Sequence, residues 1–436
     1  MAPTPFPDNF LWGAATSSYQ IEGAPLADGA GESIWHRFSH QPGNVKNGDT
    51  GDVAADHYHR FEEDVRLMHW MGLKSYRFSV AWGRVLPEGR GAVNQRGLDF
   101  YQRLVDTLLE HGIKPMLTLY HWDLPQALED KGGWLNSDIA GWFADYAEVL
   151  FRTLDDRVSL WATLNEPWVV ANHGYRIGEH APGHRTLAEV PVVAHNLLRA
   201  HANATKLYRD IGRNQIGIVV NLEPKHPASE SEADLAATQR EHVYQNLYYL
   251  DPPFLGRYPE GLAELFGEAW PGYDDAAAAE LRGVPDFVGV NYYTRGVIRD
   301  GKDDRFLRSS RVFQEERIHT TMGWEVYAAG LTEVLEMVAK RYDNIPLYVT
   351  ENGSAFPDPD HAVDGIVADP QREAYLKAHI RAVQTALDNG VDVRGYYAWS
   401  LLDNFEWAHG FSQRFGLIHI DYETLERTPK DSARAY

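Results

Sequence analysis

Two glutamates in this sequence end apolar, strand-like runs. Glu166 ends the run of residues 160–166, and Glu351 ends the similar run of residues 347–351. A carboxylate at the end of a buried strand costs free energy unless it has a partner or a function. Two of them in matched positions indicate a pair that converges in the fold. Because paired carboxylates are the minimum needed to cleave a glycosidic bond, the sequence favours that chemistry.

The elements that would position this pair are eight short runs rich in β-branched and aromatic residues. Their near-continuous apolar character is typical of strands buried on both faces, as in a parallel sheet. The predicted strands are residues 10–19, 75–82, 114–121, 160–166, 215–222, 286–293, 346–351 and 394–401.

Amphipathic segments alternate with these runs, and the pattern predicts helices there. Gly112, Gly212 and Gly390 each follow such a segment and fit as C-terminal stops. Asp369 and Pro370 precede the last segment and fit as a cap and a first-turn proline. The predicted helices are residues 61–71, 98–110, 139–154, 190–209 and 371–389.

Eight strands with helical crossovers predict an α/β fold, a single (β/α)₈ barrel over residues 1–436. Long inserts at residues 24–56 and 295–323 would be loops over its active face. A doubly wound open sheet is the alternative, and it would need a glycine-rich phosphate turn after an early strand. Gly29 and Gly31 lack a further glycine at the required spacing and open no helix.

The composition limits the possible partners. A formal net charge of −21 argues against nucleic acid and anionic membranes and fits a neutral or cationic small substrate. The sequence has no cysteine, no run of about 18 apolar residues, and no basic then apolar leader at residues 1–8. We therefore expect a cytoplasmic protein with no nucleic-acid or membrane partner, and nothing indicates a particular oligomeric state.

Polar and aromatic side chains gather where the predicted strands end, which in barrels is the active face. Each has a structural reading of its own: Asn165 as a turn residue, Arg77 as a buried counter-ion, His121 as a core histidine. Together they suit a neutral polyhydroxylated ligand, because amides and carboxylates bind vicinal hydroxyls and indoles stack on sugar rings. The set is Gln20, Arg77, His121, Trp122, Asn165, Trp168, Asn221, Asn291, Tyr293, Trp399, Glu406 and Trp407.

The histidines that stand close together in the sequence show no metal-binding pattern. His57 and His59 are two residues apart, so on a helix they would point away from each other. The sequence also lacks the HExxH motif of zinc proteases. We expect no metal and no cofactor.

Seven motifs, in order from about Phe6 to the C-terminus, resemble glycoside hydrolase family 1. Each motif is short, but seven in the same order are specific. They are FLWGAATSSYQIEG (10–23), YRFS (76–79), YHWDLP (120–125), TLNEP (163–167), NYY (291–293), TENG (350–353) and WSLLDNFEW (399–407). The resemblance implies a (β/α)₈ barrel and a retaining β-glycosidase, most simply a β-glucosidase acting on a small β-glycoside or oligosaccharide.

The resemblance also implies roles for single residues. Glu166 matches the general acid/base and Glu351 the nucleophile. The resemblance implies that the non-reducing sugar is bound by a set of side chains and that Trp399 stacks on its ring. The set is Gln20, His121, Trp122, Asn165, Glu406 and Trp407. Arg77, Asn291 and Tyr293 would surround the nucleophile and the sugar 2-hydroxyl. Trp168, His180, Asn221 and Trp324 would face the leaving group.

These roles make physical demands on the pair. The nucleophile must be ionised, and we expect Arg77 and Tyr293 to hold the pKa of Glu351 down. The acid must carry a proton near neutral pH, so Glu166 needs a drier site. A retaining mechanism predicts a separation of about 5 Å between the two carboxyl groups.

Glu406 bears on which sugar is bound. Phosphosugar enzymes of the family replace this carboxylate by a small residue and add a lysine nearby. Glu406 would repel a 6-phosphate, so we expect an unphosphorylated sugar. Glucose, galactose and fucose stay open, with a broad β-galactosidase or β-fucosidase as the alternative.

Two other functional classes are weighed against the hydrolase. A non-catalytic sugar-binding barrel would have lost a catalytic carboxylate, and both are present. A barrel isomerase or aldolase would need a strand-end lysine or a metal, and only Lys114 falls in a predicted strand, at its start. Relatives usually continue beyond a segment such as residues 429–436 into a closing helix. We therefore expect either a missing tail or an unusual closure of the barrel.

Overall fold

The computed structural model describes residues 5–359, 361–362 and 364–436, so residues 1–4 of the N-terminal segment discussed above lie outside it. Eight parallel strands close into a barrel in the order β1-β11-β10-β7-β5-β4-β3-β2. The strands are β1 (Leu11–Ala15), β2 (Ser75–Ser79), β3 (Lys114–Tyr120), β4 (Leu160–Asn165), β5 (Gln215–Asn221), β7 (Phe287–Asn291), β10 (Leu347–Asn352) and β11 (Val393–Trp399). The predicted barrel is confirmed.

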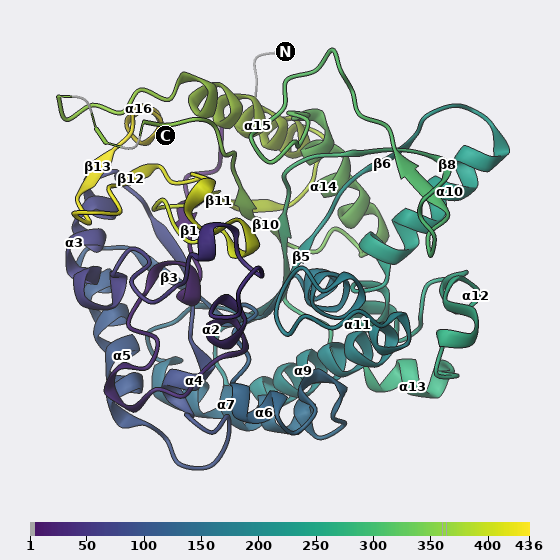
Figure 1. The fold of residues 1–436 in the computed structure, drawn as a ribbon, viewed down its shortest axis with the longest axis horizontal. Helices are drawn as coiled ribbons and strands as arrows, with labels where there is room; N and C mark the ends of the chain where they lie inside the picture. The colour runs from purple at the N-terminus through teal and green to yellow at the C-terminus, as the bar shows by residue number, and fades with distance from the viewer. Residues whose placement is uncertain (1–4, 360, 363) are drawn as a thin grey trace.

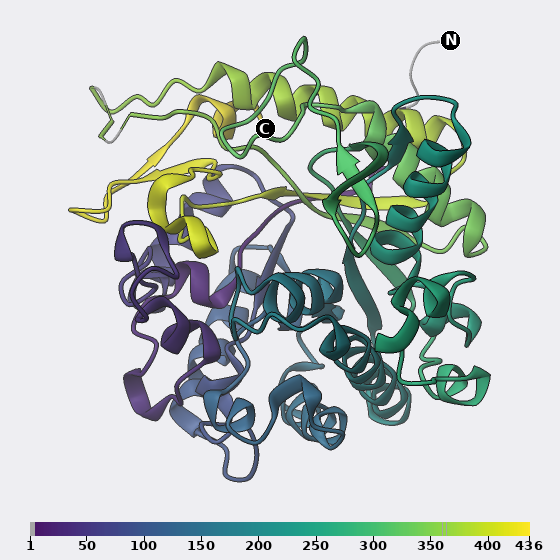
Figure 2. The ribbon, with the colours of Figure 1, turned by 45° about the vertical axis from the view of Figure 1, so that its right-hand side comes forward.

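Helices surround the barrel in both ribbon views (Figure 1, Figure 2). The long ones are α3 (His57–Trp70), α5 (Gln95–Glu110), α7 (Ile139–Leu154), α9 (Val190–Ile211), α14 (Ala329–Arg341) and α15 (Pro370–Asp388). Five of these correspond to the five predicted helical segments, two of which were predicted to end one residue later, at residues 71 and 389. In α5 the apolar positions that predicted a helix, such as Leu98, Leu104 and Leu108, are buried on one face against the barrel.

The predicted helix boundaries hold in part. Gly112 and Gly390 have φ of +72° and +89°, the left-handed geometry of a C-terminal stop, whereas Gly212 has extended backbone. Pro370 opens α15, and Asp369 takes the N-cap position. The carboxylate of Asp369 makes no cap bond, however, because it accepts hydrogen bonds from Arg372 and Ser432 instead.

The first predicted strand is too long. It was expected to cover residues 10–19, but β1 ends at Ala15 and residues Ser18–Ile21 form the short helix α1. The backbone N–H of Ser18 bonds the side chain of Ser79 on β2, which ends the ladder there. This turn brings Gln20 back over the barrel, where its side chain is fully buried.

The two predicted inserts lie where loops over the active face were expected, and one contains unpredicted strands. Residues 24–56 carry α2 (Ile34–Ser39), and residues 295–323 carry β8 (Gly296–Asp304) and β9 (Ser309–Arg311). These two strands form a small sheet with β6 (Lys225–Pro227), beside α10 (Glu232–His242) at the upper right of Figure 1. The remaining elements are α4 (Trp82–Val85), α6 (Gln126–Glu129), α8 (Pro167–Val169), α11 (Asp251–Leu255), α12 (Leu262–Phe266), α13 (Asp275–Glu280), β12 (Ile418–Ile420), β13 (Arg427–Pro429) and α16 (Asp431–Ala435).

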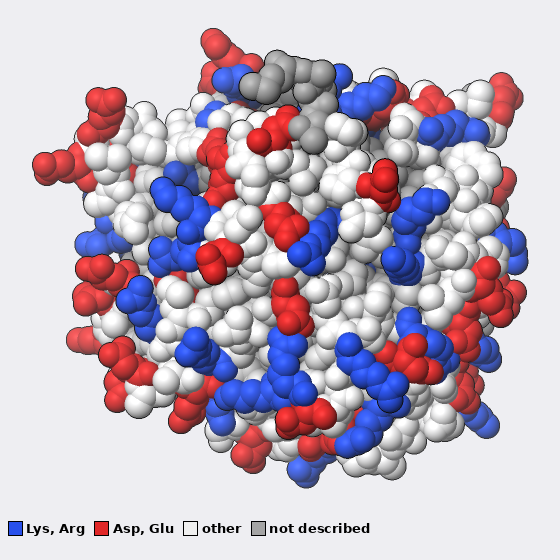
Figure 3. Space-filling model, turned by 180° about the vertical axis from the view of Figure 1, so that it is seen from behind, with Lys and Arg blue, Asp and Glu red and all other residues white. Residues whose placement is uncertain are grey.

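Charged side chains of both signs are mixed on the face of the molecule described next. On the face opposite to that of Figure 1, acidic and basic side chains are interspersed rather than separated (Figure 3). Within the described part of the chain, no helix combines the length and the apolar character that crossing a membrane requires.

Candidate active site

The two glutamates identified first stand at the carboxyl ends of β4 and β10, which are separated in the barrel by β5 and β7, and both are buried. Glu166 follows β4 directly and has a left-handed backbone, with φ 49°. Glu351 is the fifth residue of β10. The amide nitrogen of Asn291, at the end of β7, donates to Oε1 of Glu166 over 2.7 Å, and the same side chain lowers the pKa of Glu351. Both carboxylates line the same cavity, so they belong to a single site.

The surroundings of the two carboxylates differ. Arg77 donates from Nη1 to Oε1 of Glu351 over 2.6 Å, and the hydroxyl of Tyr293 donates to Oε2 over 2.7 Å. Burial raises the pKa of Tyr293 well above its usual value, so this hydroxyl keeps its proton and donates. Both oxygens of Glu351 are thus hydrogen-bonded, one of them to a cation. Glu166 accepts its hydrogen bond from a neutral amide.

This difference decides which carboxyl holds a proton. Burial, reinforced by the neighbouring Glu351, raises the pKa of Glu166 to about 8. Burial also raises the pKa of Glu351, although Arg77 and Tyr293 act against it. We expected those two residues to hold the pKa of Glu351 down; they do lower it, but burial outweighs them. A proton that enters the pair therefore resides on Glu166, and Glu351 is the ionised member.

Asn165 and His121 form a fixed hydrogen-bonded pair beside the glutamates. Oδ1 of Asn165 accepts from Arg77 over 2.7 Å and from Asn291 over 3.1 Å, which sets the orientation of its amide. The amide nitrogen then faces Nε2 of His121 at 3.0 Å, so Nε2 accepts and Nδ1 carries the proton. Burial and Arg77 lower the pKa of His121 well below its usual value, so the ring is neutral. Among the described residues Nδ1 has no partner, which leaves one donor for a ligand hydroxyl.

At the buried end of the site, the carboxyl group of Glu406 lies near packed indole rings. Nε2 of Gln20 donates to Glu406 over 3.3 Å, and burial with the charge of Glu351 raises the pKa of Glu406 to about 8. Trp399 lies parallel to the ring of His121, with centroids 5.9 Å apart. Trp407 packs against Trp122 at 4.5 Å. Apolar faces and hydrogen-bonding edges alternate here, as the recognition of a sugar ring requires.

Most of the residues predicted for the site line one cavity of about 730 Å³. These are His121, Trp122, Glu166, Trp168, His180, Asn221, Asn291, Tyr293, Trp324, Glu351, Trp399, Glu406 and Trp407. Gln20, Arg77 and Asn165 lie directly behind this wall and hydrogen-bond the residues that form it. Glu22, which follows α1, and Asp123, which comes after β3, point elsewhere: Glu22 pairs with Arg84, and Asp123 accepts from Ser18.

The residues expected to face the leaving group include three with unused polar atoms. Nε1 of Trp168, Nδ1 of His180 and Oδ1 of Asn221 are buried without a hydrogen-bond partner in the described part of the chain. All three residues line the cavity. Buried polar groups are normally satisfied, so atoms left open at a cavity wall indicate where a ligand bonds.

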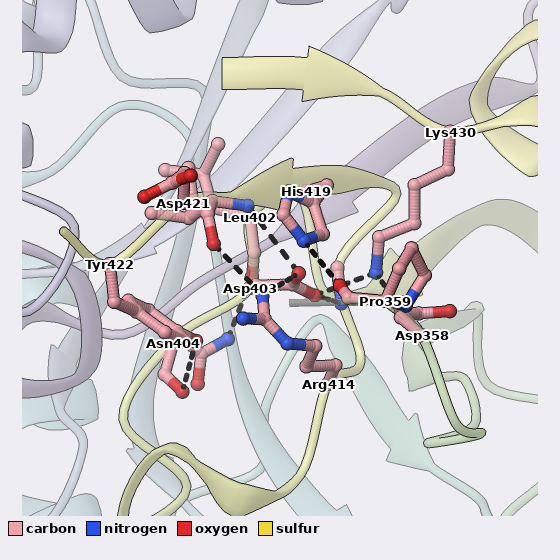
Figure 4. Close-up of polar contacts among 12 residues, drawn as sticks. Asp358, Pro359, Leu402, Asp403, Asn404, Arg414, His419, Asp421, Tyr422 and Lys430 are labelled. Atoms are coloured by element: carbon pink, nitrogen blue, oxygen red, sulfur yellow. Dashed lines mark hydrogen bonds and ion pairs between the residues drawn. The ribbon is translucent and has the colours of Figure 1, made fainter. Parts of the chain in front are cut away.

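A buried ionic cluster fixes the loop that carries Glu406 (Figure 4). Asp403 accepts from Nζ of Lys430 over 2.7 Å, from Arg414 over 2.8 Å and from the backbone N–H of Gly416 over 2.9 Å. Lys430 also bonds Asp358 over 2.5 Å. Burial would raise the pKa of Asp403, but Lys430 and Arg414 hold it at about 2. The segment after β11 is thereby tied to two distant parts of the chain.

The outer half of the cavity was not predicted. Its wall is formed by Asn172, His173, Arg176, Glu223, Glu241, Gln245, Asp304, Ser309, Ser310 and Arg311. Glu223 lies two residues after Asn221 and could have been found as a further strand-end residue. Ser309 and Arg311 belong to β9, inside the insert, and no sequence signal shows which of its side chains turn inward.

Comparisons with known proteins agree with this geometry. A family model described as Glycosyl hydrolase family 1 matches residues 2–436. Beta-glucosidase A of Thermotoga maritima is 51% identical over 433 residues, which cover 99% of this chain and 96% of the relative.

Two solved structures are similar over nearly their whole length. The beta-glucosidase from Thermotoga maritima in complex with glucoimidazole superposes with a TM-score of 0.95 at 51% identity, covering 98% of this chain and 97% of that chain. A second structure, described as the beta-glucosidase from Thermotoga maritima in complex with galacto-hydroximolactam, gives a TM-score of 0.95 at 50% identity, with 98% and 97% coverage.

Proposed function

We propose that Glu351 is the nucleophile and Glu166 the general acid/base of this chain. The chain belongs to glycosyl hydrolase family 1 and is a retaining β-glucosidase. The observation that carries this assignment is the asymmetry of the pair. Glu351 is bonded by the cation of Arg77 and by Tyr293, whereas Glu166 accepts from the amide of Asn291. An ionised nucleophile and a protonated acid need these two different surroundings.

The reaction then has two steps. The carboxylate of Glu351 attacks the anomeric carbon while Glu166 gives its proton to the glycosidic oxygen, so the aglycone leaves as an alcohol. In the resulting ester Glu351 has no charge. Because that charge contributes to the raised pKa of Glu166, the pKa of Glu166 falls and its carboxylate can accept a proton from water. Water attacks the ester and restores both groups with the original anomeric configuration.

The donor sugar is proposed to lie over Trp399. His121 would donate from Nδ1 to one hydroxyl, and Glu406 would accept from two others. Trp122 and Trp407 would wall the pocket, with Gln20 and Asn165 holding Glu406 and His121 from behind. A 6-phosphate would lie against the buried Glu406, which offers it no positive charge, so the proposed substrate is unphosphorylated.

A second specificity, for β-galactosides, rests on one comparison. The related enzyme from Thermotoga maritima is described in complex with a galacto-configured compound. We propose that Glu406 and Gln20 accept an axial as well as an equatorial 4-hydroxyl, because a carboxylate offers several acceptor directions. Rates on 4-nitrophenyl β-glucoside, β-galactoside, β-fucoside and glucoside 6-phosphate measure this directly.

The assignment of the glutamates is tested with azide. Glu351→Ala should be inactive on 4-nitrophenyl β-glucoside, and added azide should restore turnover and give the α-glucosyl azide. Glu166→Ala, tested on 2,4-dinitrophenyl β-glucoside, should give the β-glucosyl azide, because Glu351 still forms the ester. Unchanged hydrolysis by Glu351→Ala, or the same azide anomer from both variants, would reject the assignment. The cytoplasmic location expected from the sequence stays a prediction, which fractionation of producing cells would test.

A further inference from the structure

Two histidines and an aspartate converge on the outer side of the first insert, away from the cavity. His36 lies on α2, His40 follows that helix directly, and Asp52 comes from the loop that leads to α3. Nε2 of His40 is 3.0 Å from one oxygen of Asp52, and Nε2 of His36 is 3.7 Å from the other. The possible ligand atoms of these three residues lie within 4.8 Å of one another.

The other ring nitrogens show which way each imidazole is protonated. Nδ1 of His40 faces the carbonyl oxygen of His36 at 2.7 Å, so it must donate and carry a proton. Nδ1 of His36 faces the carboxylate of Glu32 at 3.1 Å and donates in the same way. In the neutral form of each ring, the Nε2 lone pair therefore points at the carboxylate of Asp52.

Two lone pairs directed at a carboxylate repel it unless a positive charge lies between them. Protonating His40 alone would make its 3.0 Å contact with Asp52 a hydrogen bond but would leave the lone pair of His36 facing the other oxygen. Protonating both rings would place two imidazolium ions with centroids only 4.4 Å apart, and these would repel each other. A single divalent cation satisfies all three groups at once. Imidazoles whose second nitrogen donates to a carboxylate or a carbonyl are the usual metal ligands in proteins.

We propose that His36, His40 and Asp52 bind one zinc ion. Two imidazole nitrogens and a carboxylate oxygen are typical zinc ligands, with bond lengths of about 2.0–2.2 Å. A tetrahedral site then places its ligand atoms about 3.4 Å apart, which the present spacing reaches with small side-chain movements. The side chains of His40 and Asp52 are 41% and 45% exposed, so water can complete the coordination.

The site would brace the wall of the donor pocket, which goes beyond the proposed function. Trp35, next to His36 on α2, is fully buried and packs against Trp407 with ring centroids 4.6 Å apart. The backbone of Asp52 accepts from Ala24 at the start of the insert. A zinc ion would therefore join α2 to the end of the same insert and resist its opening.

Binding is tested by titrating zinc chloride into the full chain without a polyhistidine tag, at pH 7.5, in a calorimeter. The expected result is one site with a Kd of about 10 μM or tighter. His40→Ala and Asp52→Asn should each weaken it at least about 30-fold. His59→Ala is the matched control, because His59 is an exposed histidine that pairs with Asp56 but has no second histidine at that carboxylate. Equal binding by wild type and Asp52→Asn, or no binding by wild type below about 100 μM, would overturn the proposal.

A second measurement does not depend on heats of binding. Zinc at 100 times its Kd should raise the Tm of the wild type and of His59→Ala by about 3 °C, because the ligand binds only the folded chain. Asp52→Asn should show no such rise, while its Tm without zinc stays close to that of the wild type. A rise of the same size in Asp52→Asn would place zinc elsewhere and reject the site.

Discussion

Arg77 and Glu351 form an ion pair whose Nη1 and Oε1 atoms are 2.6 Å apart, and their side chains are 0% and 4% exposed. The same guanidinium donates to Asn165 from Nη2 and to Thr118 from Nε. Arg77 thus fixes the positions of Glu351, the proposed nucleophile, and of Asn165, which precedes Glu166. Removing the charge of Arg77 should therefore change both the ionisation of Glu351 and the positions of Glu351 and Asn165.

Arg77→Gln should lower kcat/KM by about 1,000-fold or more, since it leaves a buried carboxylate without its cation. The pKa of Glu351 should rise further, because Arg77 is the largest influence that lowers it. The acidic limb of kcat/KM against pH should therefore move to higher pH, measured with 2,4-dinitrophenyl β-glucoside. Arg84→Gln breaks the buried pair with Glu22, outside the cavity. This control should cost stability and leave the pH profile in place; a shift in both variants would contradict the argument.

Tyr293→Phe removes one hydrogen bond to Glu351 and little else. We expect kcat to fall by about 10- to 100-fold and the acidic limb to move to higher pH, because the carboxylate loses a donor. Tyr292→Phe is the matched control, since the hydroxyl of Tyr292 donates to the carbonyl of Tyr327 instead. Steady-state kinetics from pH 4 to 8 measure both variants. An unshifted acidic limb in Tyr293→Phe would show that this hydroxyl does not tune the nucleophile.

Glu406→Gln should make the protein more stable at pH 8 and less active. The folded pKa of Glu406 is about 8, against a usual value of 4.5, so between these values the folded state binds more protons than the unfolded state. The free energy of unfolding therefore falls as pH rises through this window. Glutamine cannot ionise, so the gain should be on the order of 4 kcal/mol at pH 8 and near zero at pH 4. Urea unfolding at both pH values measures it, and an equal gain at both would refute the ionisation account.

Gly353→Ala should abolish most activity without touching a catalytic group. A Cβ at this position would lie 1.7 Å from the carbonyl oxygen of Trp399, so the strand end that carries Glu351 must move away from the stacking floor. We expect kcat/KM to fall by about 100-fold or more. Gly141→Ala in α7 is the control, because its Cβ meets nothing within 4 Å. That variant should keep full activity and gain about 0.5–1 kcal/mol.

Lys430→Met should weaken donor binding from a distance. Its ammonium lies between the buried carboxylates of Asp403 and Asp358, and removing it leaves each of them with a single cation, Arg414 and Arg372 respectively. The expected loss of stability is about 3–5 kcal/mol. Because Asp403 anchors the loop that bears Glu406, KM for 4-nitrophenyl β-glucoside should rise more than kcat falls, measured well below the Tm of the variant. A change in kcat alone would mean that the cluster does not act through the donor site.

The barrel could be predicted because each buried strand is a short apolar run bounded by polar residues. The exception is instructive. Residues 10–19 continue the same pattern through Thr16 and Ser17, yet the strand stops at Ala15 because Ser18 bonds Ser79 at the end of the neighbouring strand β2. A contact between residues 61 positions apart leaves no mark on local periodicity.

That Glu166 and Glu351 share one site could be predicted from strand ends, but the electrostatics of that site could not. Arg77 and Tyr293 were predicted to lie near Glu351, and both do bond it. The sequence does not show how far the effect of burial on the pKa of Glu351 exceeds the opposite effect of these two residues, and burial raises that pKa. Nor could it find Arg311 on the outer wall, because that side chain is placed by the small sheet of the second insert.

The cavity has a buried end and an exposed end, and this determines the order in which the two products leave. His121, Trp399 and Glu351 at the inner end are at most 5% exposed, whereas Glu179, Asp303 and Arg311 at the outer end are exposed. A sugar at the inner end can leave only through the space that the aglycone occupied. The alcohol is therefore the first product out and glucose the last. A second glycoside that enters before glucose has left blocks its exit, so turnover should fall at high substrate concentration.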